Sequence, residues 1–124
     1  MNLPKIAHYA TRPDVIQSRG DGSFLYNYDI QAELISDRPG EAERESFICS
    51  QVIVFESPTK KAVKKAVIEN EFPGDEEKKL INDFNAFNSG SLVDAKYRDN
   101  YLAFLERRKA IKEMIDNEPL IEYN

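Results

Sequence analysis

Alternation of apolar and polar residues from Phe24 to Ile35 constrains the fold of this chain more than any other feature. Within FLYNYDIQAELI, apolar side chains recur at every second position. Because successive side chains of a strand point to opposite faces of a sheet, this pattern predicts a strand with one face in the core. The expected core face carries Tyr26, Tyr28, Ile30, Ala32 and Leu34, and the expected solvent face carries Asn27, Asp29, Gln31 and Glu33.

Residues 47–55 (FICSQVIVF) are rich in β-branched and aromatic side chains, which favours a second strand. A polar loop at 37–45 separates the two strands, so an antiparallel pairing is natural. Two strands alone are marginally stable in water. The N-terminal segment, the C-terminal tail or a partner chain must therefore extend the sheet.

The first 23 residues contain Pro4, Pro13, Gly20 and Gly22, a composition that predicts extended or loosely structured chain. A short strand is suggested at 15–18. The run RGDGS at 19–23 predicts a turn, because glycine and aspartate tolerate positive φ angles.

The second half of the chain shows the spacing and the boundary residues of helices. Ser57 followed by Pro58 matches an N-cap and a first helical residue, and the sequence FPG at 72–74 ends this helix. Asp75 is the expected N-cap of a second helix. Because the strands precede the helices, we predict an α+β fold in which a small antiparallel sheet, containing 24–35 and 46–56, packs against two or three C-terminal helices.

A last helix is predicted at 93–116, and at 1.5 Å per residue it would be roughly 35 Å long. A sheet of two or three strands is narrower than this helix is long. We therefore expect the distal part of the helix, together with the tail, to bind another chain, and the β-prone tail could add to a sheet edge, its own or a partner's. The candidate protein interface consists of Tyr97, Tyr101, Phe104, Arg108, Ile111, Ile115, Leu120 and Tyr123. The alternatives are that the tyrosines pack inside the chain and that the helix folds back on the N-terminal segment.

The first predicted helix begins with four lysines and ends with glutamates, so its charges oppose the helix dipole. The lysines are expected on the solvent side, opposite Val63 and Val67. They form a candidate anion patch for phosphate or an acidic protein surface, and the competing interpretation is a solvated face. We favour the solvated face, because the segment lacks the interleaved aromatic rings of a nucleic-acid groove. The patch consists of Lys60, Lys61, Lys64 and Lys65.

The 124 residues are expected to form a single domain, with strands at 24–56, helices at 57–117 and a tail at 118–124. The net charge of −5 argues against nucleic acid as the main partner. The single cysteine fits a reducing compartment, and no stretch resembles a signal peptide or a membrane helix. We expect a cytoplasmic or virion-associated protein that does not bind membranes.

No catalytic, cofactor or metal site is predicted. His8 is the only histidine and Cys49 the only cysteine, and their spacing does not suit zinc. The acids at 75–77 are explained by helix capping and by the helix dipole. Motifs for nucleotide binding or for a nucleophilic serine are not found.

The order of features resembles a family of small uncharacterised proteins encoded in the tail modules of phages and prophages of Bacteroides-type bacteria. The residues that carry the resemblance include Tyr26, Tyr28 and Ile30 of the first strand, the run QVIV at 51–54, and the run AVI at 66–68. They continue with Leu80, Ile81 and Phe84, and with Tyr97, Tyr101, Phe104 and Arg108, where the last helix is similar to that of tail-fibre assembly proteins. The resemblance covers roughly residues 24–115.

The resemblance implies a non-enzymatic structural or assembly protein, with a virion or tail component or a second copy of the chain as its partner. The alternative function is a small regulatory module that binds nucleic acid through the lysines of the first helix. A catalytic domain ranks last.

Overall fold

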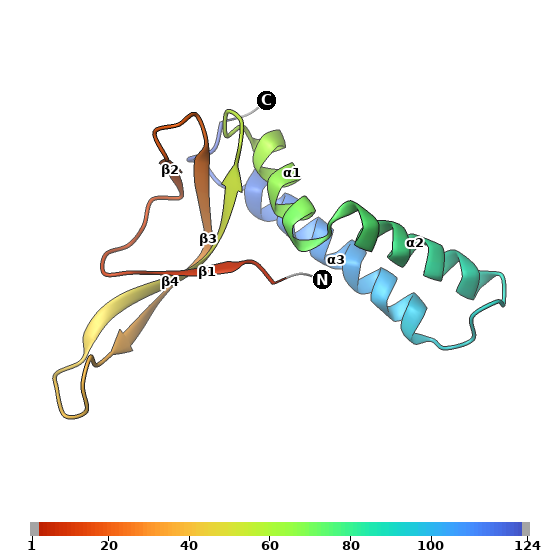
Figure 1. The fold of residues 1–124 in the computed structure, drawn as a ribbon, viewed down its shortest axis with the longest axis horizontal. Helices are drawn as coiled ribbons and strands as arrows, with labels where there is room; N and C mark the ends of the chain where they lie inside the picture. The colour runs from red at the N-terminus through yellow and green to blue at the C-terminus, as the bar shows by residue number, and fades with distance from the viewer. Residues whose placement is uncertain (1–2, 123–124) are drawn as a thin grey trace.

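The computed structural model describes residues 3–122. Its elements follow in the order β1 (Lys5–Tyr9), β2 (Ile16–Ser18), β3 (Phe24–Ile35), β4 (Arg44–Val54), α1 (Lys60–Glu71), α2 (Gly74–Asn88) and α3 (Lys96–Asp116). The strands form one antiparallel sheet in the order β1-β4-β3-β2, and three helices follow in the C-terminal half (Figure 1). The predicted α+β fold is confirmed.

The N-terminal segment extends the β3–β4 hairpin on both edges. The short strand suggested at 15–18 is confirmed as β2, which pairs with β3, whereas β1 was not predicted and pairs with β4. Two added strands bring the sheet to the size at which it can stand without a partner chain.

A bulge in β3 reverses which side chains face the core. The pairing of β3 with β4 shifts between Tyr28 and Gln31, and Asp29 adopts a left-handed backbone with φ of 51°. Tyr26 and Tyr28 are buried as predicted, but Leu34 beyond the bulge is 68% exposed. The single core face predicted for the whole of β3 is therefore wrong after Tyr28, because one extra residue moves all later side chains to the other face.

Asn27, expected in solvent, is buried on the face of the sheet away from the helices. Its Oδ1 accepts a hydrogen bond of 2.8 Å from Gln51 Nε2, and its Nδ2 donates one of 2.8 Å to the carbonyl of Asp14. The segment between β1 and β2 thus covers part of the second face, and its backbone gives the amide of Asn27 the partner that a buried polar group needs.

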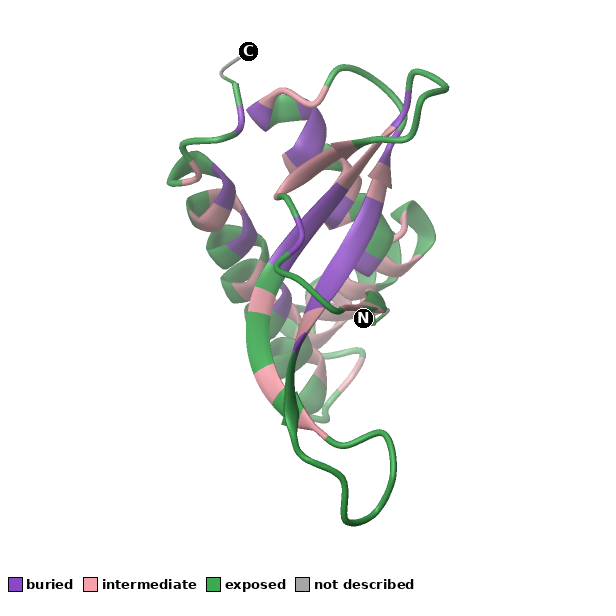
Figure 2. Cartoon of the chain, turned by 90° about the vertical axis from the view of Figure 1, so that its left-hand side faces the viewer, coloured by how far each residue is buried: buried purple, intermediate pink, exposed green. Residues whose placement is uncertain are grey.

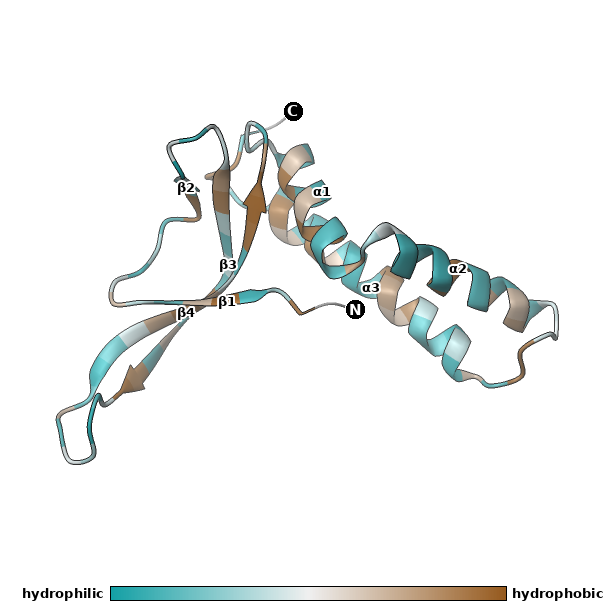
Figure 3. Ribbon diagram, in the orientation of Figure 1, coloured by the Kyte–Doolittle hydropathy of each residue, from teal (hydrophilic) through white to brown (hydrophobic). Residues whose placement is uncertain are grey.

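The core lies between the upper part of the sheet, α1 and the last turns of α3 (Figure 2). Val63 and Val67, one turn apart on α1, have no exposed area. They face strand residues such as Val54, and Figure 3 shows the same apolar colouring on the facing parts of β4 and α1.

The predicted helix starts need correction. The N-cap of α1 is Thr59, whose side chain accepts a hydrogen bond of 3.2 Å from the N–H of Ala62, so Ser57 and Pro58 lie before the helix. Asp75 lies inside α2, which starts at Gly74 with Pro73 as its N-cap. The start of α3 is Lys96, not Val93, because the Asp94 carboxylate accepts the N–H of Lys96 and ends the preceding loop.

The orientation of α3 reverses the prediction for its distal half. Ile111 and Ile115 have no exposed area and belong to the central core. It is the first half of α3 that extends away from the sheet, alongside α2 (Figure 1). The chain returns to its own sheet at the end of α3, so the distal residues are covered by the chain itself.

The C-terminal tail also stays with its own chain. Ile121 is 3% exposed in the core, and Glu122 forms an isolated parallel bridge with Thr59. The tail therefore joins the start of α1 and does not extend an edge of the sheet.

Candidate functional site

A helical arm projects from the sheet. It comprises α2, the connection at 89–95 and the first half of α3 up to Leu105 (Figure 1). None of the residues of α2 is buried, although its inward face carries Leu80, Ile81, Phe84 and Phe87. A two-helix layer without a third layer cannot remove these side chains fully from water.

Two of the aromatic residues predicted as an interface pack against other parts of the chain. Tyr101 stacks on Phe84 with ring centroids 4.3 Å apart. Phe104 packs edge-on against Phe72 at 4.7 Å and is 4% exposed. The alternative of packing inside the chain thus holds for these rings, and Phe104 is not available to a partner.

The remaining predicted interface residues fall in different places. Ile111 and Ile115 are core residues and are removed from the interface for that reason. Tyr97 is half-buried on the arm, Arg108 is exposed, and Leu120 is 70% exposed. Tyr123 lies outside the described residues.

Apolar side chains that the sequence analysis did not select are exposed on the arm. Leu102 is 49% exposed, Leu105 39% and Val93 89%. Leu102 and Leu105 are three residues apart and therefore neighbours on one helix surface. Together with half-buried α2, they give the arm an apolar surface that its own chain does not cover.

The lysine patch is divided between buried and exposed positions, which corrects the expectation that all four lysines face solvent. Lys60 is 5% exposed, and its Nζ donates a hydrogen bond of 2.6 Å to the carbonyl of Asp116 at the end of α3. Lys64 forms an ion pair with the carboxylate of the same residue. The negative end of the α3 dipole accounts for the Lys60 contact with the backbone carbonyl, and opposite charge accounts for the Lys64 ion pair. Lys61 and Lys65 remain exposed.

A groove of about 610 Å³ brings these lysines together with basic residues of α3. Its basic lining consists of Lys60, Lys61, Lys64, Lys65, Arg108 and Lys112, and its acidic lining consists of Glu69, Glu77 and Asp116. No aromatic ring lines the groove, and Ile68 supplies an apolar contact. Lys112 was missed by the sequence analysis, since only the packing of α3 on α1 places it beside the patch.

A buried charge network joins the sheet to both helices of the core. Glu71, 1% exposed at the end of α1, accepts two hydrogen bonds from Arg107 of α3, at 2.8 and 3.0 Å. Tyr28 of β3 donates a third to the same carboxylate at 3.3 Å. The sequence held one signal of it, because Glu71 follows Val67 by four residues and so shares the buried face of α1.

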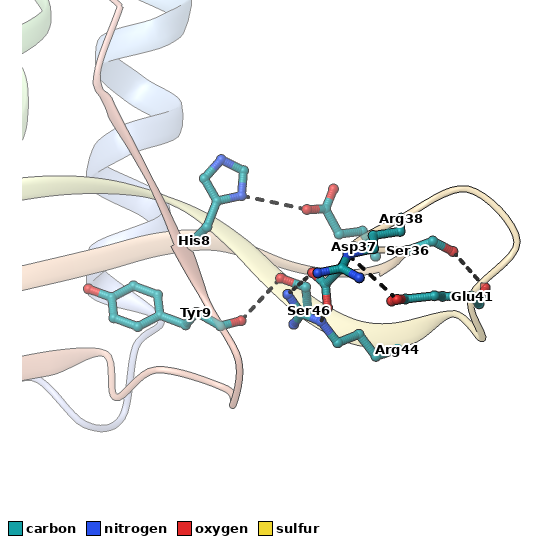
Figure 4. Close-up of polar contacts among 9 residues, drawn as sticks. His8, Tyr9, Ser36, Asp37, Arg38, Glu41, Arg44 and Ser46 are labelled. Atoms are coloured by element: carbon teal, nitrogen blue, oxygen red, sulfur yellow. Dashed lines mark hydrogen bonds and ion pairs between the residues drawn. The ribbon is translucent and has the colours of Figure 1, made fainter.

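The distal β3–β4 hairpin is held by surface contacts (Figure 4). Arg44 donates two hydrogen bonds to Asp37, at 2.9 and 3.1 Å, and this guanidinium keeps the pKa of the Asp37 carboxyl below its ordinary value. His8 of β1 lies 3.6 Å from Glu33, and Ser46 donates to the Tyr9 carbonyl at 3.2 Å. These contacts brace the hairpin.

Residues 3–122 contain neither a cluster of metal ligands nor a thiol with a lowered pKa. No group of three or more histidine, cysteine or acidic side chains in this range could hold a metal ion. Cys49 is buried against Asn27, and burial raises the pKa of its thiol, which is the opposite of what a nucleophile needs. Within the same range, no helix is both long enough and apolar enough to cross a membrane.

Comparison of the chain with protein-family models, with curated proteins and with solved structures finds no match.

Proposed function

We propose that this protein is a non-enzymatic structural or assembly protein that binds another protein through its helical arm. The observation that carries the proposal is the unfinished packing of the arm. α2 has no buried residue, and Leu102 and Leu105 of α3, the other helix of the arm, are exposed.

A helical hairpin gains stability by burying an apolar face. The sheet and α1 contact the end of α3, so they do not cover the apolar face of the arm. A third layer supplied by a partner would bury the half-exposed side chains of both helices at once. Tyr97 and the exposed Leu105 suit such an interface, because tyrosine and large apolar side chains are favoured where two proteins meet.

The resemblance to tail-module proteins supports a virion or tail component as the partner, and a location in the host cytoplasm or in the virion. A catalytic role receives no support from the described residues, since the pKa of the Cys49 thiol is raised and His8 lies on an exposed strand.

The test is affinity purification from cells that produce the virions, with tagged wild-type protein and variants as baits. The double variant Leu102→Asp with Leu105→Asp should lose a virion structural protein that the wild type retains. Leu34→Asp is the matched control, because Leu34 is an equally large, exposed apolar residue on the distant hairpin. The proposal fails if no virion protein depends on the arm.

A second candidate is nucleic-acid binding in the lysine groove, favoured by the addition of Arg108 and Lys112 to the patch. The net charge of −5 and the lack of aromatic lining weigh against it. Fluorescence anisotropy with short DNA and RNA at about 50 mM salt decides between the two, because phosphate contacts are strongest at low salt. We expect no micromolar binding. Binding that Lys61→Glu with Lys65→Glu abolishes would favour the second candidate.

A further inference from the structure

The edge of β4 that faces β1 is only partly paired. β1 pairs with β4 from Tyr9 opposite Phe47 to Lys5 opposite Gln51, and β4 continues to Val54. Beyond Gln51, no described residue pairs with β4 on this side. Pro4 has no N–H to offer and Leu3 is 83% exposed, so β1 does not continue along the edge.

The ladder itself shows which backbone groups this edge presents. Asn27 donates its N–H to the Val15 carbonyl at 2.8 Å, away from β4. In an antiparallel ladder, successive residues turn their N–H and C=O groups to alternate sides. The backbone N–H and C=O groups of Leu25 therefore also point away from β4. Its partner Ile53 turns both backbone groups outward, to the side that lacks a strand.

A groove of about 660 Å³ lies along this edge. Ile53 lines it from β4, Phe55 lines it just beyond the end of β4, and the small side chains of Ala62 and Ala66 line it from α1. Phe55 is 80% exposed. An extended strand at the usual spacing of about 4.8 Å from β4 would occupy this groove, with the two alanines leaving room for it.

The charges along the helical wall are self-complementary. Lys65 and Glu69, one turn apart, both line the groove, and neither forms an ion pair with any residue in the described range 3–122. In α1 as a whole the lysines come first and the glutamates last. A second copy of α1 running antiparallel would place its glutamate end beside the lysine end of the first.

We infer that two copies of this protein pair through the β4 edge in a symmetric antiparallel dimer, with a continuous sheet across the two-fold axis. With the axis at Val54, Phe55, which directly follows β4, joins the strand on pairing, and Ile53 of each copy exchanges backbone hydrogen bonds with Phe55 of the other. Each Phe55 then packs on an isoleucine, a favourable cross-strand pair. The antiparallel α1 helices add the contact area and the charge pairs that so short a strand pairing needs.

The first test is mass by light scattering and sedimentation over a wide concentration range. The wild type should approach twice its 14.3 kDa chain mass. Phe55→Lys should raise the dimer dissociation constant at least about tenfold, because it places a charge in an apolar cross-strand pair. Leu34→Lys is the matched control, since Leu34 is 68% exposed on the far hairpin. Both sites are exposed, so folding should survive, as circular dichroism will check.

The second test asks whether the two α1 helices run antiparallel across the dimer. Lys65→Glu and Glu69→Lys should each weaken the homodimer, and an equal mixture of the two variants should recover heterodimers by native mass spectrometry. Lys61→Glu is the control on the same helix, outside the edge groove. The Ile53 amide should exchange hydrogen more slowly as protein concentration rises.

A wild type that stays monomeric, or a dimer that Phe55→Lys weakens no more than Leu34→Lys does, overturns the inference. A mixture that recovers no heterodimer overturns the antiparallel arrangement. Loss of the dimer by the arm variant Leu102→Asp with Leu105→Asp, but not by Phe55→Lys, would assign self-association to the arm instead. The proposed function depends on a virion partner of the arm, so it stands or fails separately.

Discussion

Arg107 grips Glu71 with both arms of its guanidinium, Nε to Oε1 at 2.8 Å and Nη2 to Oε2 at 3.0 Å, across the contact between α3 and α1. The carboxylate is 1% exposed, while the arginine side chain is 32% exposed at the protein surface. Because the arginine stays partly solvated, forming the pair desolvates mainly the carboxylate. Loss of the arginine would destabilise the fold strongly, since it would leave the buried carboxylate charge without a partner.

We predict that Arg107→Met lowers the free energy of unfolding by about 3 kcal/mol. Arg108→Met, the adjacent exposed arginine, should change it by less than about 0.5 kcal/mol. Urea denaturation measures both. The double variant Glu71→Leu with Arg107→Met should recover a large part of the loss, since it removes both charges together. Equal effects of the two arginine variants would contradict a structural role for the pair.

Ile111→Ala and Ile115→Ala should each cost roughly 3 kcal/mol of unfolding free energy, because each leaves a cavity in the core. The loss should be the same at every protein concentration, since the contacts lie within one chain. Leu102→Ala on the arm is the comparison and should cost less than about 1 kcal/mol in the isolated chain. Thermal melts at several concentrations give the answer. A difference in melting temperature between wild type and Ile111→Ala that changes with protein concentration would return these residues to an intermolecular interface.

Lys60→Met should lower the unfolding free energy by about 2 kcal/mol, because it removes a charged donor from the end of α3. Lys61→Met, its exposed neighbour, should have little effect on the same urea curve. The difference separates a lysine that caps a helix from one that only faces solvent. If both variants behave alike, the contact with Asp116 contributes nothing measurable.

Burial raises the pKa of Tyr26 and of Tyr28 above the ordinary value of 10.0, and the nearby carboxylates of Glu118 and Glu71 respectively add to the shift. The folded state therefore holds protons that the unfolded state releases. The contribution of these two groups to the free energy of unfolding should be fully present below about pH 10 and should be lost as the pH rises toward their folded-state pKa values. Absorbance of tyrosinate against pH, with circular dichroism, should show these two rings ionising only as the protein unfolds.

Tyr28→Phe removes one of the two shifted ionisable groups. The free energy of unfolding of this variant should therefore fall less steeply with pH above about pH 10 than that of the wild type, and its alkaline unfolding midpoint should lie at higher pH than its stability at pH 7 alone would give. Tyr97→Phe on the arm is the control and should leave the midpoint in place. Reversible ionisation of all six tyrosines without unfolding would refute the shifted pKa values.

Local sequence patterns identified the two long strands and the helices, but they did not identify β1 or which face of each element would be buried. The alternation in β3 identified a strand, yet it treated twelve residues as regular, and a bulge at Asp29 reversed the second half. An alternating sequence does not show where an extra residue enters the ladder, because that depends on the pairing with β4.

The candidate surfaces depended more strongly on tertiary contacts. The apolar stripe of α3 was visible in the sequence, but the half of it that the sheet would cover was not. A helix of this length can meet the sheet with either end, and the choice follows from the loop at 89–95, which sends the chain back toward its own core. Ile111 and Ile115 became core for this reason, and the arm became the uncovered part.

By itself, the sequence determined the α+β class, the two long strands, the three helices and the acidic balance of charge, because each rests on residues near one another in the chain. The tertiary structure alone decided that Lys60 caps α3, that Arg107 meets Glu71, and that Ile53 faces an open edge. Each of these features depends on which residues distant in sequence come together, and that is decided by how the sheet and helices pack.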